Sequence, residues 1–275
     1  MLPQAAENTR AAAAAARYIE RMKALQIDIR EACVPNRASH VMKPSRAQEY
    51  SGLLPDCVVM TEKSRLTPFL AYVVVFHLAW IAWPFVVYPR LETIGNATLL
   101  YALLNIALRL LLWVAPVLLY LRYVDGVEPF GYLGLRRHVN RGMVVAAVLT
   151  AMNLIGSIAR FGLPHPVAQS ITWNSVLGTS FMVGFIEEIP YRGFMLLKLA
   201  ERVNFWLANA ITSLLFVAIH VPGWIALHTL SAPKAVEIFI FGAVMAAVSR
   251  WSGSLWAPII THSANDFISF ILFRV

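Results

Sequence analysis

The chain has 275 residues, of which 59% are hydrophobic and 14% are charged, and its formal net charge is +8 at pH 7. Soluble domains carry about a quarter charged residues, so this composition excludes an ordinary water-soluble protein. The positive charge does not indicate a nucleic-acid partner, because the basic residues cluster at the ends of apolar stretches, where they report the orientation of membrane spans.

The charged residues divide the chain into a polar N-terminal segment, 1–65, and a membrane domain, 66–275. The first segment holds ten of the 23 Lys and Arg residues and seven of the 15 Asp and Glu residues. Apolar residues at near-helical spacing predict a surface helix over 10–33. A loosely ordered linker is expected over 34–62.

Seven apolar stretches predict an all-α, polytopic transmembrane helical bundle with a short cytoplasmic helical segment before it. A bilayer core about 30 Å thick requires roughly 20 mostly apolar residues in a spanning helix. The stretches that meet or nearly meet this length are 66–89, 97–121, 142–161, 171–199, 204–225, 235–250 and 254–273. Prolines and a glycine near 222–234 interrupt the pattern and predict a re-entrant or tilted element there.

Lysines and arginines in the short loops predict the orientation of the bundle. They concentrate on one side, which is therefore expected to be cytoplasmic, with the N-terminus inside and the C-terminus outside. The expected location is a bacterial inner membrane. The residues on that side are Lys63, Arg65, Arg122, Arg136, Arg137, Arg141, Lys198, Arg202 and Arg250.

The fourth stretch carries three charged residues in the sequence GFIEEIPYRGF. A charge at the centre of a span costs about 2.5–3.5 kcal/mol on insertion, so it usually has a function. Glu188 and Arg192 are spaced i, i+4 and are expected to pair. A pair that only joins helices would explain these two residues but not Glu187, which points about 100° away. Pro190 is expected to kink the helix, because it lacks an amide proton.

Two other stretches carry ionisable residues at the same i, i+4 spacing. The fifth ends in LLFVAIHVPGW, with Phe216 and His220 on one face, and the seventh contains HSAND, with His262 and Asp266 on one face. Considered alone, His220 is better explained as a core residue than as a catalytic one. The His262–Asp266 pair could likewise be a hydrogen-bonded pair that only helps the helices to pack. Together with Glu187, they could converge on a water-filled cavity and supply a general base and oxyanion partners. This chemistry indicates hydrolysis, most naturally of a peptide bond.

The ordered motifs EExxxR, FxxxH and HxxxN/D resemble those of the CAAX protease and bacteriocin-processing (CPBP) family, which includes prenyl-protein endopeptidases. They stand at 187–192, 216–220 and 262–266, and the resemblance covers roughly residues 130–275. It implies a glutamate-dependent intramembrane endopeptidase in which Glu187 and His220 activate water.

The resemblance also implies supporting roles. Glu188 and Arg192 would orient the water-activating pair, and His262 with residue 266 would contact the oxyanion. Where family members have Asn as the last motif residue, its amide can donate to the oxyanion. Asp266 can donate only when protonated, so it could instead orient His262. Asn265 is a stand-in donor on a neighbouring helix face.

Zinc is the competing chemistry, since His and Glu are normal zinc ligands. Glu187, His220 and His262 would be its ligands. No HExxH helix is present, and the glutamate mechanism that the resemblance implies needs no metal, so the favoured expectation is no cofactor. The expected partners are a membrane-associated protein or peptide substrate and the lipid bilayer.

Two other functions remain open: a catalytically silent protein of the same fold, acting in immunity or as a scaffold, and a proton-coupled transporter. A prenylated CAAX tail, a peptide precursor and a membrane-anchored sorting tail all fit as substrates. His77 and Arg109, in the first two stretches, lie outside the motifs and are interpreted as residues that snorkel or pair across helices. His228, between the fifth and sixth stretches, could line the entrance to the site or be an ordinary loop residue.

Overall fold

The computed structural model of the protein describes residues 66–164 and 171–273. The regular secondary structure of these residues is helical throughout, which confirms the predicted all-α fold class. The helices belong to the unit Arg65–Val275, into which the chain divides after Ser64. The surface helix predicted over 10–33 and the linker over 34–62 lie outside the described residues.

Within residues 66–164 and 171–273, five helical stretches are long and apolar enough to cross a membrane, and they mark the chain as an integral membrane protein. Their outer faces expose large apolar side chains, as lipid contact allows, for example Val75, Leu111, Val144, Leu214 and Ile240. The five stretches are Leu66–Glu92 (α3, Leu66–Ala82, and α4, Tyr88–Glu92), Leu99–Val124 (α5, Leu99–Arg109, and α6, Ala115–Leu119), α8 (Val139–Phe161), α11 (Phe205–Ala226) and α12 (Ala232–Ser252).

The remaining helices correspond to the fourth and seventh predicted stretches, which carry the motifs. The fourth runs through a π-helical segment, Asn174–Phe181, then α9 (Val183–Glu188), a second π-helical segment, Ile189–Met195, and α10 (Leu196–Ala200). The seventh consists of α13 (Trp256–Asp266) and the π-helical segment Phe267–Phe273. A short helix, α7 (Pro129–Tyr132), precedes α8.

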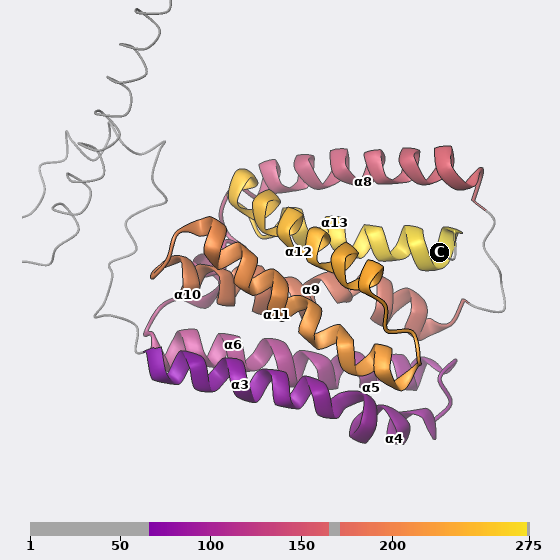
Figure 1. The fold of residues 1–275 in the computed structure, drawn as a ribbon, viewed down its shortest axis with the longest axis horizontal. Coiled ribbons are helices and arrows are strands. Elements are labelled where there is room, and N and C mark those ends of the chain that lie inside the picture. Colours follow the sequence, from indigo (N-terminus) through magenta and orange to yellow (C-terminus); the bar gives the residue numbers. More distant parts are fainter. Residues whose placement is uncertain (1–65, 165–170, 274–275) are drawn as a thin grey trace, which may run out of the picture. The chain divides into compact units, whose positions relative to one another are not determined.

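The fourth stretch forms the centre of the bundle. In Figure 1, α9 lies between α3 on one side and α8 on the other, and every residue from Ile186 to Leu196 is buried. The π-helical segment begins at Ile189, next to Pro190. The predicted disruption by proline therefore takes the form of wider helical turns within a helix that is shielded from lipid by its neighbours.

A glycine lets α9 and α13 approach each other closely. A methyl group at Gly184 would overlap the carbonyl oxygen of Ile259 and lie 2.6 Å from Ser263 Oγ. The Gly184 amide donates a hydrogen bond of 3.3 Å to that hydroxyl, which in turn donates to the Phe181 carbonyl at 2.9 Å. This contact brings the motif residues of the two helices to the same level.

Gly184→Ala is expected to lower the free energy of unfolding by about 1–3 kcal/mol, because the added methyl overpacks a backbone contact. The loss should appear as a lower melting temperature of the detergent-solubilised protein, followed by tryptophan fluorescence. Gly156→Ala is the matched control, since nothing lies within 4 Å of a Cβ at that helical glycine. Equal melting temperatures of the two variants would mean that α9 and α13 do not pack tightly at Gly184.

The predicted interruption near 222–234 falls at 227–231, and no separate re-entrant helix lies between α11 and α12. Helix α11 continues through Pro222 to Ala226, and α12 begins at Ala232 with Pro233 in its first turn. Proline is tolerated inside membrane helices because neighbouring groups satisfy the backbone carbonyl that it leaves free.

Candidate active site

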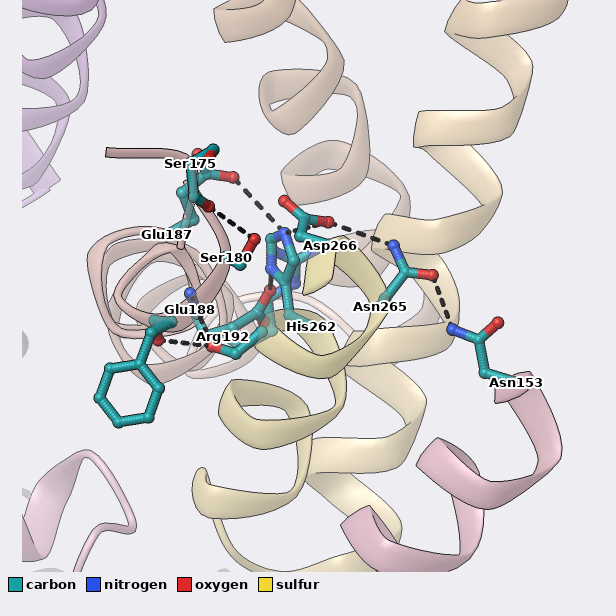
Figure 2. Close-up of polar contacts among 12 residues, drawn as sticks. Asn153, Ser175, Ser180, Glu187, Glu188, Arg192, His262, Asn265 and Asp266 are labelled. Carbon is teal, nitrogen blue, oxygen red and sulfur yellow. Dashed lines mark hydrogen bonds and ion pairs between the residues drawn. The ribbon is translucent and has the colours of Figure 1, made fainter. Parts of the chain in front are cut away.

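Five of the six ionisable motif residues, all except His220, meet at the contact between α9 and α13 (Figure 2). Glu187 and Glu188 end α9, and Arg192 lies one turn further along the central helix. His262 and Asp266 project from α13 toward these residues. The approach of the two helices therefore concentrates three carboxylates in one place within an apolar bundle.

Glu188 links the two helices through a single oxygen. Its Oε1 accepts hydrogen bonds from Arg192 Nη1 at 3.1 Å and from His262 Nδ1 at 2.6 Å. The predicted i, i+4 pair is thus present, and it has a third member from α13. Glu188 is fully buried and Arg192 is 2% exposed. The Arg192 guanidinium also lies 4.2 Å from the centre of the Phe216 ring, a cation–π contact.

His262 is held so that its second nitrogen faces the other two carboxylates. Its Nδ1 donates to Glu188, and its Nε2 lies 3.9 Å from Glu187 Oε2 and 4.0 Å from Asp266 Oδ1. The ring also packs at 4.8 Å against Phe241. Because Nδ1 is occupied, Nε2 is the atom that remains available to a bound molecule.

Glu187 is paired with an arginine that the sequence analysis set aside. Its Oε1 accepts from Arg109 Nη2 at 3.3 Å, and Oε2 faces His262. Arg109 comes from the end of α5, in the second predicted span. The signal that could have identified it is the cost of placing an arginine inside an apolar span, which usually reflects a buried partner.

His220 approaches the group through Phe216 rather than through a hydrogen bond to a carboxylate. Its Nδ1 donates to the Phe216 carbonyl at 2.7 Å, so Nε2 of the neutral ring is left as an acceptor. The Phe216 ring packs against both His220 and His262, at 4.9 and 6.1 Å between ring centres. His220 also interacts electrostatically with Glu187.

Asp266 receives its hydrogen bond from its neighbour in sequence. Asn265 Nδ2 donates to Asp266 Oδ1 at 3.2 Å, and Asn153 Nδ2 of α8 donates to Asn265 Oδ1 at 3.0 Å (Figure 2). Asn153 therefore fixes the amide of Asn265 with its donor toward Asp266. This contact joins α8 to the site.

The other two histidines of the sequence analysis lie apart from the carboxylates. His77 Nε2 lies 3.1 Å from Tyr191 Oη, and its Nδ1 contacts the Val73 carbonyl at 2.7 Å, so it connects α3 to the central helix. His228 is exposed in the loop after α11 and has a positive φ of 53°.

The positions of the candidate ligands can be compared with the needs of a zinc site. Within residues 66–164 and 171–273, no group of three or more His, Cys, Asp or Glu side chains is arranged to hold a metal ion. Glu187 and His262 face each other across 3.9 Å, and each has another partner: Arg109 for Glu187 and Glu188 for His262. The arrangement places carboxylates and imidazole nitrogens together inside an apolar bundle.

Comparison with known proteins agrees with the motifs. Residues 168–268 match the family described as type II CAAX prenyl endopeptidase Rce1-like. The match confirms the resemblance drawn from the sequence, and it contains all six predicted site residues, whereas Arg109 lies outside it. No curated protein and no solved structure matches the chain.

Proposed function

We propose that this integral membrane protein, whose residues 168–268 match the type II CAAX prenyl endopeptidase Rce1-like family, is a glutamate-dependent intramembrane endopeptidase. The observation that carries the proposal is the environment of Glu187. One of its carboxylate oxygens is held by Arg109, and the other faces an imidazole nitrogen inside the bundle. A carboxylate held in this way is suited to take a proton from water.

In the proposed reaction, Glu187 accepts a proton as the water oxygen attacks the carbonyl carbon of the scissile peptide bond. Nε2 of His220 accepts a hydrogen bond from the same water and orients it. The carbonyl oxygen becomes an oxyanion, to which Nε2 of His262 donates when that ring is protonated. The carbon–nitrogen bond then breaks, and the leaving amine receives the proton held by Glu187.

Glu188 and Arg192 have supporting roles in this scheme. Glu188 accepts a hydrogen bond from His262 Nδ1 and thereby fixes the imidazole ring that would face the oxyanion. Arg192 holds Glu188 in place through its own hydrogen bond to the same oxygen. Asp266 completes the surroundings of His262 Nε2, with its carboxylate held by Asn265.

The proposed substrate is a membrane-associated protein or peptide tail, and a prenylated CAAX tail is the first to test because of the family match. The full chain in lipid vesicles should cleave a farnesylated CAAX peptide on the carboxyl side of the prenylated cysteine, as identified by mass spectrometry. Non-prenylated peptide precursors and membrane-anchored sorting tails form the other arms. Cleavage that persists with a chelator would count against the zinc alternative.

His220→Ala is expected to lower kcat about 10²-fold, because the attacking water loses its acceptor. His228→Ala is the matched control, since this histidine is exposed and lies in a loop outside the site. Equal rates for the wild type and both variants would remove His220 from the proposed mechanism.

A further inference from the structure

The Arg109 side chain enters the site from a span outside the family match. Its Nη2 lies 3.3 Å from Glu187 Oε1, and 15% of its side chain is exposed. The two residues are 78 positions apart in sequence. An arginine at this depth is costly unless it has a partner, and Glu187 is the carboxylate with which it pairs.

Two tryptophan rings also lie next to the Arg109 guanidinium. Arg109 lies 5.6 Å from the ring centre of Trp113 and 6.0 Å from that of Trp80. The two rings pack at 4.4 Å, and Trp113 is fully buried. Cation–π contacts with buried rings restrict the guanidinium to one position, so Arg109 offers Glu187 a fixed partner.

The charges of the site explain why such a partner is needed. Glu188 has Arg192 as its counter-charge, but Glu187 and Asp266 both face the same nitrogen of His262, at 3.9 and 4.0 Å. Two carboxylates that face the same nitrogen repel each other in an apolar environment. Arg109 interacts electrostatically with both of them. It supplies positive charge next to both Glu187 and Asp266.

We propose that Arg109 is a positioning residue for Glu187, which fixes Oε1 so that Oε2 is directed to His262 and the attacking water, and which offsets the charge of Asp266. The inference rests on the proposed function. It extends the catalytic site to the second span, beyond the three motifs.

The first test compares Arg109→Gln and Arg109→Lys in the vesicle assay with the farnesylated CAAX peptide. For Arg109→Gln, kcat is expected to fall about 10–100-fold, because a carboxylate displaced by an ångström loses its alignment. KM should stay within about twofold, because Arg109 does not bind the substrate. Arg109→Lys should recover much of the lost kcat, because lysine keeps the positive charge. The recovery should be incomplete, because lysine lacks the planar set of donors of arginine.

Arg160→Gln is the matched control, as this arginine lies exposed at the end of α8 and packs on Phe161. Its kcat should equal that of the wild type. A melting temperature is recorded for each variant, so that a general loss of stability is separated from a loss of alignment.

A double-variant cycle tests the link with Asp266. If Arg109 offsets the charge of that carboxylate, Arg109→Gln should reduce kcat less in an Asp266→Asn background than in the wild type. Equal effects in both backgrounds would overturn the charge argument. A normal kcat, or a higher KM alone, for Arg109→Gln would overturn the positioning role.

Failure of the proposed function can be distinguished from failure of the role of Arg109. Cleavage that is lost in Glu187→Gln but normal in Arg109→Gln overturns only the role of Arg109. Cleavage that survives in Glu187→Gln, or a wild type inactive toward all three substrate classes, overturns the proposed function and the role of Arg109 with it.

Discussion

Glu187→Gln is expected to lower kcat for peptide cleavage about 10⁴-fold, at the upper end of the range for loss of a general base. The amide has nearly the shape of the carboxylate, and its oxygen can still accept from Arg109, so the packing of the site is retained. The amide, unlike the carboxylate, cannot take a proton from water. Rates measured with the farnesylated CAAX peptide, alongside melting temperatures, would separate this chemical loss from unfolding.

Glu187→Asp is the graded control for this experiment. It keeps the charge but withdraws the carboxylate by one methylene group, so its kcat should lie between those of the wild type and Glu187→Gln. If Glu187→Gln cleaved at a rate close to the wild type, another group would have to activate the water.

Glu188→Ala should cost both stability and activity. The variant leaves the buried guanidinium of Arg192 without its carboxylate, and removal of one partner of a buried ion pair typically costs about 3–5 kcal/mol. It also frees the ring of His262, which donates to the same oxygen. A lower melting temperature and a loss of cleavage are the expected results.

The double variant Glu188→Leu with Arg192→Met separates the two contributions. Replacing both partners of a buried pair by apolar residues of similar volume is often neutral, so the melting temperature should recover toward that of the wild type. Cleavage should stay low, because His262 still lacks its acceptor. If cleavage recovered as well, Glu188 would serve only the stability of the bundle.

Features encoded within one helix could be predicted from the sequence. Length and hydropathy identified the five long apolar helices, and i, i+4 spacing identified the Glu188–Arg192 pair. Both depend on the geometry of a single helix, which periodicity reports directly. The exception is Pro222, where the local pattern indicated a break but the helix continues.

Contacts between helices could not be predicted in the same way. The Glu188–His262 and Arg109–Glu187 contacts join residues 74 and 78 positions apart, and the Asn153–Asn265 bond joins residues 112 apart. Helix periodicity shows which face a residue occupies, but it does not show which other helix covers that face. The close approach at Gly184 decides this for α9 and α13, and a lone glycine in a span gives little sign of it.

The burial of the central helix has a consequence for how the protein is made. The stretch 183–196 holds Glu187, Glu188 and Arg192, and insertion scales assign about 2.5–3.5 kcal/mol to a central charge, so it is a poor substrate for the translocon by itself. The ion pairs that offset this cost come from α13 and from α5. Helix α5 precedes this stretch in the chain and α13 follows it, so its charges can be fully compensated only once α13 has been synthesised. The stretch is therefore expected to settle in the bundle only after α13 has been inserted, and a chain truncated before α13 should hold it poorly in the bilayer.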